Sequence, residues 1–436
     1  MKKIQILGLA VALVTIPSVA HADWTVIHAG KLLATPGNAP MTNASVIIHD
    51  NKITNVTAGF VGADTIDAGG ESVTVIDLSD KFVLPGLIDS HVHLTSEPNV
   101  PFGERILEST EYSTLIGAKN AHVTLQAGFT TVADLGSSTY SAYALRDAIN
   151  DGVIEGPRIL AAGASISVTG GHADGSNSLP DKWWPQQNDI NISQCNGADD
   201  CRYRVRNLAK RGSDIIKITA TGGVLSQQGR GLDQHFTQDE MKAIVETAHL
   251  LGLKVTAHAH GTGGIKAAIS AGIDSIEHST LIDAEGARMA RRAGTYLIPT
   301  LTAYYGVEQG LAAGVFTPPV LAKIDAITKV KEDALPQLFA RGNKIAFGTD
   351  AGVFEHGLNA LEFGRMVNAS GMSPMTAIEI ATVNAADHLG ISATVGSIEA
   401  GKYADIIAVN GDPLSDVTIL ENVSFVMKNG DVAKSE

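Results

Sequence analysis

Positive charge and long apolar runs are both scarce in this 436-residue sequence, and each scarcity excludes a class of partner. Lysine and arginine number 32 against 46 aspartate and glutamate residues, which gives a formal net charge of −14. Proteins that bind nucleic acid neutralise phosphates with basic clusters, so we expect no nucleic-acid partner here. No segment after the first 22 residues is long and apolar enough to span a bilayer, so we expect no membrane partner for the mature chain.

Cysteine is also scarce, with only Cys195 and Cys201 in the stretch CNGADDC. In an oxidising compartment this pair can close a small disulfide loop, and free thiols are the alternative. A metal site is a third interpretation. No further Cys or His joins the pair at zinc-finger spacing, which argues against that third interpretation.

The first 22 residues have the pattern of a secretory signal peptide. Two lysines precede an apolar stretch, residues 4–16, and the small-residue motif Ala20-His21-Ala22 follows. Such segments are removed during export. We therefore expect a soluble mature protein that begins at Asp23 and is periplasmic or secreted.

Two kinds of pattern divide the remaining chain. Residues 23–85 and 395–436 consist of short β segments with turn signals such as Asn429-Gly430. Neither end is apolar enough to form a core alone, so we expect both to pair in one small β-sandwich domain. Between them, over residues 86–394, eight strand-like runs alternate with helical ones. This alternation predicts an α/β fold with a (β/α)8 TIM-like barrel, whose chemistry lies at the carboxyl ends of its strands.

Polar residues interrupt five of the predicted strand ends. His91 and His93 in GLIDSHVHL point the same way, because side chains alternate along a strand. The candidate ligands are His91, His93, Lys217, His258, His278 and Asp350. A single histidine at a strand end is more often a packed core residue than a ligand. Six candidates that converge on one mouth favour a metal site instead.

Lys217 is the most unusual of these residues, because it interrupts the apolar strand DIIKITATG. A buried ammonium must be paired, neutralised or modified. One interpretation is a buried ion pair with Asp214 or Asp350. The other is that carbon dioxide carboxylates Lys217, which turns a cation into a carbamate able to bridge two metal ions.

The order of these residues resembles the binuclear, metal-dependent branch of the amidohydrolase superfamily. FVLPGLIDSHVHL, DIIKITATGGV, VTAHAHG, GIDSIEHST and GKYADIIAVNGDPL are most similar to its Xaa-Pro dipeptidase, imidazolonepropionase-like and ochratoxinase-like members. The resemblance covers essentially the whole mature chain. It implies His91, His93 and Asp350 on a more buried metal, His258 and His278 on a more exposed one, and N6-carboxylated Lys217 between them. The His-rich ligand set suits zinc, so we expect two Zn²⁺ ions.

The resemblance also implies the reaction, which is hydrolysis of amide bonds in N-acyl or Xaa-linked amino acids, with ochratoxin-type amides among the candidates. Two cations would lower the pKa of a water to give hydroxide, and Asp350 would be the catalytic base that carries its proton to the leaving nitrogen. His172, His260 and Tyr304 are candidates for substrate binding. For His172 an ordinary loop histidine is the alternative. We expect a small-molecule amide or peptide substrate and a homo-oligomer.

Other functions are less consistent with the sequence. A deaminase of the same superfamily typically uses one metal without a bridging lysine, so Lys217 argues against it. A cyclic-amide or lactone hydrolase stays open. A noncatalytic periplasmic binding protein would be free to lose its inward ligands, and this chain has all six.

His388, near a predicted helix end, is left out of the site because dipole or solvent contacts account for it.

Overall fold

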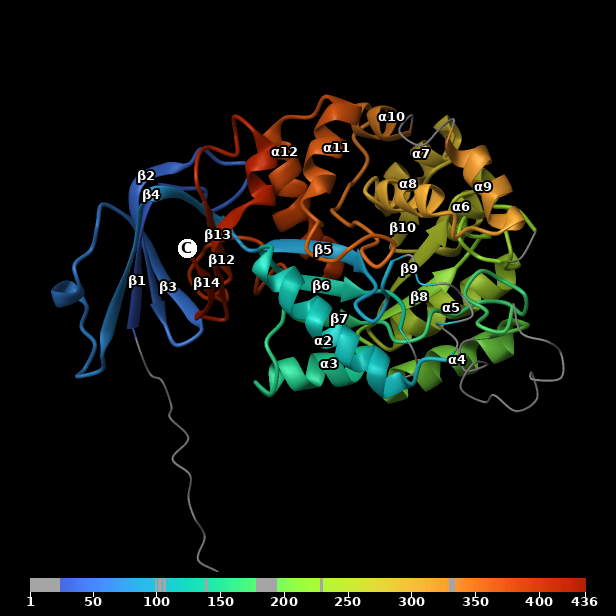
Figure 1. The fold of residues 1–436 in the computed structure, drawn as a ribbon, viewed down its shortest axis with the longest axis horizontal. Helices are drawn as coiled ribbons and strands as arrows, with labels where there is room; N and C mark the ends of the chain where they lie inside the picture. Colours follow the sequence, from blue (N-terminus) through green and yellow to red (C-terminus); the bar gives the residue numbers. More distant parts are fainter. Residues whose placement is uncertain are drawn as a thin grey trace, which may run out of the picture.

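The structure is a computed structural model that describes residues 24–436 apart from 99, 101–103, 105–106, 138–139, 178–193, 228–229 and 329–333. The expected signal peptide, residues 1–22, lies outside the described residues. Figure 1 shows a β domain at the left and a larger part in which strands and helices alternate. Within the described ranges, every helix is too short or too polar to cross a membrane.

One seven-stranded sheet joins the two ends of the chain, as the sequence predicted. Its order is β14-β13-β12-β4-β1-β2-β3. The strands are β1 (Trp24–Leu32), β2 (Met41–His49), β3 (Lys52–Ala58), β4 (Val73–Pro85), β12 (Ile406–Val409), β13 (Val423–Lys428) and β14 (Asp431–Ser435). Strands β4 and β12 pair antiparallel, with Leu84 opposite Ile407. Apolar side chains from both ends share one buried core, and neither end therefore needs a core of its own.

The larger part is the barrel. Seven of its strands are regular: β5 (Leu87–Val92), β6 (Phe129–Asp134), β7 (Arg158–Ala161), β8 (Ile215–Thr219), β9 (Lys254–Ala259), β10 (Ser275–His278) and β11 (Tyr296–Ile298). Parallel pairing joins consecutive strands in two groups, β5-β6-β7 and β8-β9-β10-β11. A parallel bridge from Ile166 to Ile218 connects the two groups. Bridges from Leu297 to Ile345 and from Val92 to Ala351 close the ring through the eighth segment.

The eighth segment, residues 343–350, differs from the prediction because it forms no regular strand. Its backbone makes hydrogen bonds both to neighbouring strands and to a helix. Ser90 of β5 donates its N–H to Phe347 O, but Phe347 donates its own N–H to Ile380 O at 3.1 Å. Ile380 begins a π-helical turn, η4 (Ile380–Asn384), between α12 (Pro374–Glu379) and α13 (Ala385–Leu389). A π turn leaves carbonyls free of helix bonds, and one of them binds this barrel segment.

Helices cover the outside of the barrel (Figure 1). They are α2 (Thr110–Gln126), α3 (Ser141–Asn150), α4 (Ala198–Arg211), α5 (Gln238–Leu250), α6 (Thr262–Ala271), α7 (Ala284–Ala293), α8 (Ala303–Ala313), α9 (Pro318–Thr328), α10 (Ala334–Ala340) and α11 (Leu361–Ser370), followed by α12 and α13. Thr237 and Glu240 have the spacing of a capping box in the sequence and form one at the start of α5, and Ser373 caps α12. Gly390, at φ 77°, ends α13.

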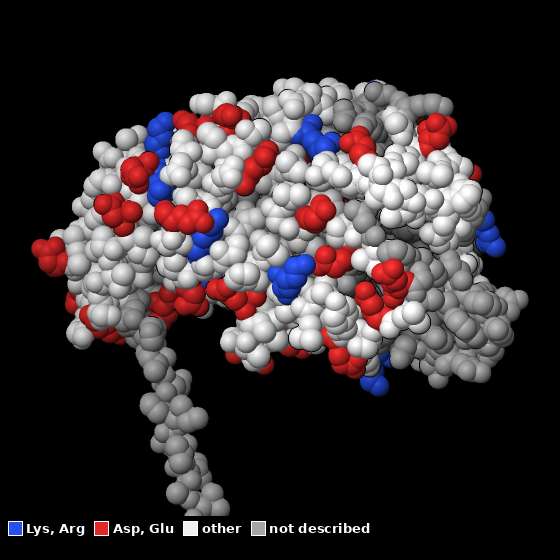
Figure 2. Space-filling model, in the orientation of Figure 1, with Lys and Arg blue, Asp and Glu red and all other residues white. Residues whose placement is uncertain are grey.

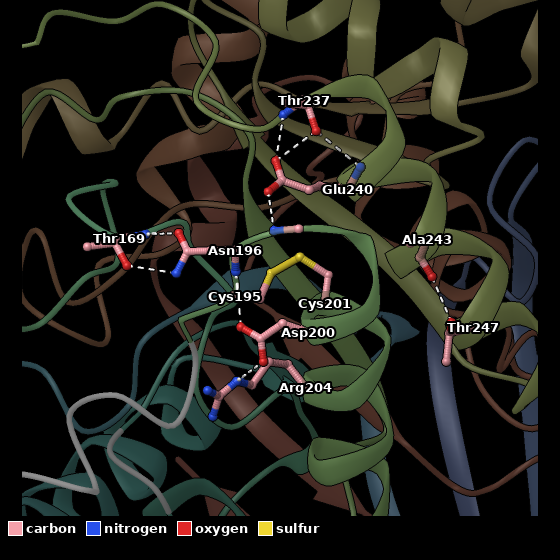
Figure 3. The surroundings of a disulfide bond; sticks show 11 residues. Thr169, Cys195, Asn196, Asp200, Cys201, Arg204, Thr237, Glu240, Ala243 and Thr247 are labelled. Carbon is pink, nitrogen blue, oxygen red and sulfur yellow. Dashed lines mark hydrogen bonds and ion pairs between the residues drawn. A yellow bond between two sulfur atoms is a disulfide. The ribbon is translucent and has the colours of Figure 1, made fainter.

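Cys195 and Cys201 form a disulfide, which resolves the alternatives left by the sequence. Both cysteines are fully buried at the start of α4. Figure 3 shows the bond beside the capping box of α5, where Glu240 accepts a hydrogen bond from Gly197 N at 2.6 Å. The disulfide therefore closes the entry to α4, and the hydrogen bond to Glu240 holds that entry against α5.

We expect replacement of Cys195 and Cys201 by alanine to lower the free energy of unfolding by about 2 kcal/mol, because an unfolded chain without the loop gains entropy. Denaturant unfolding of the wild type and the variant would measure the loss. Either single alanine variant should lose as much as the double variant, since each breaks the same crosslink. Unchanged unfolding midpoints would show that the loop contributes nothing.

Candidate metal centre

His91, His93 and Asp350 form one group of converging ligand atoms. The histidines lie at the end of β5, and Asp350 ends the eighth barrel segment. Asp350 Oδ1 is 3.3 Å from His91 Nε2 and 3.2 Å from His93 Nε2, and the two Nε2 atoms are 3.3 Å apart. Imidazole nitrogens and a carboxylate oxygen at this spacing suit a divalent transition metal such as zinc.

A second group lies beside the first and contains only histidines. His258, His260 and His278 come from the ends of β9 and β10, and one ligand atom of each lies within 4.8 Å of the others. The ring centroids of His91 and His278 are 5.2 Å apart, so the two groups adjoin. From the sequence, His260 was expected to bind substrate. The structure places it in the same cluster as the two expected ligands.

Lys217 lies in β8 and is 3 % exposed. Its Nζ is 3.4 Å from His91 Nε2. Burial lowers the pKa of the ammonium, while the negative charges of Glu277, Asp350 and Asp134 oppose this shift. The alternative ion pair with Asp214 is wrong, because the Asp214 carboxylate accepts from Arg146 Nη1 at 2.7 Å and from Ala161 N at 2.9 Å.

The histidine rings are held by contacts at their Nδ1 atoms. His93 Nδ1 is 2.9 Å from Gly136 O, and His260 Nδ1 is 2.8 Å from Thr280 Oγ1. His278 Nδ1 is 2.7 Å from Thr300 Oγ1. An Nδ1–H that donates to these oxygens leaves the Nε2 lone pair facing the cluster, which is the arrangement that metal-ligating histidines use.

His258 is held the other way round, with its Nε2 3.3 Å from Gly222 O. Burial lowers the pKa of His91, His258 and His278 well below the ordinary value of a histidine. Their rings are therefore neutral at physiological pH, and neutral imidazole is the form that binds metal. Burial raises the pKa of Asp350, but electrostatic interactions with His91, His93 and Lys217 and a hydrogen bond with His93 outweigh it, which brings this pKa to about 2.

Several backbone positions at the mouth are strained. His278, Thr300 and Asp350 have φ of 71°, 49° and 62°, a left-handed region that non-glycine residues seldom adopt. Such conformations persist only where surrounding contacts hold them, and they cluster at functional sites. Two of the three, His278 and Asp350, are candidate ligands. The third, Thr300, contacts His278.

Asp89, which precedes His91 in the first barrel strand, was not assigned a role from the sequence. It is fully buried and joins the first strand to the eighth. Its carboxylate accepts from His91 N at 3.0 Å, from Thr349 N at 3.1 Å and Oγ1 at 2.6 Å, and from Asn359 Nδ2 at 2.7 Å. Asp89 therefore holds the backbone on both sides of the first ligand group.

Two more buried carboxylates support the ligands. Glu277 Oε2 lies 2.8 Å from His91 Nδ1. Asp134 accepts from Leu94 N at 2.9 Å, one residue beyond His93. Three residues, Asp89, Asp134 and Glu277, are charged residues inside apolar predicted strands, as Lys217 is. That signal could have identified them from the sequence.

The other predicted residues lie around the second group. The ring of His172 is 4.3 Å from that of His258, centroid to centroid. Tyr304 is buried in α8, and its hydroxyl donates to Thr280 Oγ1 at 3.4 Å, so it reaches the cluster through the partner of His260. His388 was wrongly explained by solvent: it is 1 % exposed and packs against Tyr296, with the ring centroids 5.2 Å apart.

Comparison with known proteins identifies the family of the chain. Residues 82–433 match the model of the amidohydrolase family. The ochratoxinase of Aspergillus niger is 31 % identical over 96 % of this chain and 88 % of its own. A solved Xaa-Pro dipeptidase with bound methionine is 40 % identical, with a TM-score of 0.87 over 94 % of this chain and 99 % of that one. A prolidase complexed with N-methylphosphonate-L-proline is 27 % identical, with a TM-score of 0.85 over 95 % and 100 % of the two chains.

These likenesses extend over both the terminal sheet and the barrel, and enzymes of the superfamily generally use metal ions. The expected superfamily and fold class are confirmed. The chain belongs to the amidohydrolase family and is a hydrolase that acts on amide or peptide C–N bonds.

Proposed function

We propose that this protein is a binuclear metal-dependent hydrolase that cleaves the amide bond of N-acyl or Xaa-linked amino acids. The observation that carries the proposal is the pair of adjoining ligand groups with the buried amine of Lys217 beside them. One group would hold a metal through His91, His93 and Asp350. The other would hold a second through His258 and His278, with His260 close enough to contribute.

Carboxylation of Lys217 is part of the proposal. Its burial lowers the pKa of the amine, which favours the neutral form that reacts with carbon dioxide. The ammonium first loses one proton, and the lone pair of the neutral nitrogen then forms the N–C bond with release of a second proton, so a cation becomes an anion. The change suits a position that faces two cations, because an uncompensated ammonium there would repel them.

Two divalent ions would polarise the substrate carbonyl and lower the pKa of a water. The His-rich donor set suits zinc. The protein's own residues would do the rest. Asp350, held at both sides by the barrel closure, would accept the proton of the attacking water and deliver it to the leaving nitrogen. His172 and His260 lie where a bound substrate would contact them.

The substrate class rests on the similar proteins. Their names refer to an ochratoxinase, an Xaa-Pro dipeptidase and a prolidase, and one of them holds methionine. A dipeptide or N-acyl amino acid would share the amide bond to an amino acid. A lactone or cyclic amide is the second candidate, and Lys217 disfavours a deaminase.

The setting of the enzyme is also a proposal. The signal-like residues 1–22 favour export, and the buried disulfide suits an oxidising compartment. On the face shown in Figure 2, basic side chains are scattered among acidic ones, which does not favour a nucleic-acid partner. A homo-oligomer remains an expectation that a size measurement in solution would test.

We expect the purified mature protein to hold about two zinc ions per chain, because each ligand group suits one divalent ion. Elemental analysis after metal-supplemented expression would measure the content. A chelator should abolish amide hydrolysis, and added zinc should restore it. A content of one ion or none would contradict the binuclear proposal.

Lys217→Ala should remove the bridge and lower both metal content and turnover, the latter by ~10²-fold or more, since even residues that only support ligands cost 10–100-fold. Short-chain carboxylates such as acetate should restore part of the activity by occupying the vacated position. Lys242→Ala is the matched control, because this lysine is exposed on α5. A fully active, fully loaded Lys217→Ala enzyme would favour a buried ion pair instead.

The substrate class can be tested with a panel of dipeptides, N-acyl amino acids, ochratoxin A, lactones and aminated purines, with products identified by mass. We expect free amino acids from the amides. Asp350→Asn should lower that turnover by ~10²–10⁴-fold, provided that metal content is unchanged, because the proton carrier is lost. Ring opening of lactones alone, or ammonia from purines, would assign a different reaction.

A further inference from the structure

A buried carboxylate on the helix layer holds the turn that follows β11. Glu362 lies in the first turn of α11 and is fully buried. It accepts three hydrogen bonds, from Leu301 N at 2.8 Å, Thr302 N at 2.6 Å and Thr302 Oγ1 at 2.7 Å. All three donors belong to two consecutive residues of the turn. Glu362 therefore fixes the backbone of this turn from outside the barrel.

The turn contains a strained residue immediately before those donors. Thr300 has φ of 49°, and a β-branched residue is a rare occupant of this region. Its backbone is the start of the segment that Glu362 binds. A conformation of this kind persists only when neighbouring contacts over-determine it, and the bonds to the next two residues supply that constraint.

The same turn contacts one histidine of the second ligand group directly, and the start of α8 that follows it reaches a second histidine through Thr280. Thr300 Oγ1 is 2.7 Å from His278 Nδ1. Tyr304, two residues beyond Thr302, donates to Thr280 Oγ1, which is 2.8 Å from His260 Nδ1. Displacement of the turn would therefore disturb the orientation of both rings. The first ligand group, by contrast, has its own buried carboxylate in Asp89.

We propose that Glu362 is a positioning residue for the second metal site, acting through the strained Thr300 to orient His278. The inference rests on the proposed function, because it assumes that the histidine group holds a metal. It goes beyond that function in assigning a role to a residue that contacts neither ligand group directly. A purely structural role would lower stability without changing one metal site selectively.

Glu362→Gln is the first test, because it retains the shape of the side chain but replaces one acceptor oxygen with a donor. We expect one of the two zinc affinities to fall by ~10–100-fold while the other is unchanged, as found for residues that support metal ligands. Competition with a chromophoric chelator would measure both affinities. The absorption spectrum of the cobalt-substituted protein should change at one site. Glu355→Gln, which removes an exposed carboxylate nearby, is the matched control.

Thr300→Val tests the route, since it keeps the β-branched shape and all three bonds of Glu362 but loses the hydroxyl at His278. It should weaken the same site. If Glu362 acts through Thr300, the double variant should bind zinc about as well as Thr300→Val alone. Thr300→Val also tests the proposal by itself if Glu362→Gln does not fold.

Two outcomes would overturn the inference. In one, Glu362→Gln lowers the melting temperature but leaves both zinc affinities unchanged. In the other, Thr300→Val leaves the second site unaffected. Failure of the proposed function is distinguishable, because the wild-type protein would then bind fewer than two zinc ions before any substitution is made.

Discussion

The hydrogen bonds of Asp89 are the interaction on which the site depends, because they join the first and last segments of the barrel. This carboxylate binds His91 N on one side and both the N–H and the hydroxyl of Thr349 on the other. Ligands from opposite ends of the barrel sequence can meet at 3.3 Å only if the ring closes there. The irregular eighth segment cannot secure that closure by strand pairing alone, since Phe347 gives its N–H to the helix layer.

The charges beneath the mouth explain why so many polar groups tolerate burial. Lys217 lies among the negative charges of Glu277, Asp350 and Asp134, while burial lowers the pKa of neighbouring His91 and keeps that ring neutral. A buried charge is costly unless it is paired. Binding of divalent ions would supply positive charge at the same place, and a carbamate in place of the ammonium would then be the better partner.

In both ligand groups, a buried carboxylate holds the backbone beside a strained residue. Asp350 follows Thr349, whose N–H and hydroxyl bind Asp89, and Thr300 precedes Thr302, whose N–H and hydroxyl bind Glu362. Each buried carboxylate satisfies backbone donors next to a residue in a left-handed conformation. Within the described part of the barrel, the non-glycine residues with a left-handed backbone all lie at the mouth, where ring orientation matters.

The sequence by itself determined the α/β barrel and the joined terminal sheet and indicated six candidate ligands, because strand alternation and charged residues in apolar runs are local signals. It also supplied the cap of α5, since a capping box spans only four residues. The disulfide, the π turn and the position of His260 required the tertiary structure. They depend on which distant atoms meet, as when Ile380 accepts a bond from Phe347. Glu362 gave no signal in its helix, because an acidic residue in a first helical turn is ordinary, and only folding places it against the turn after β11.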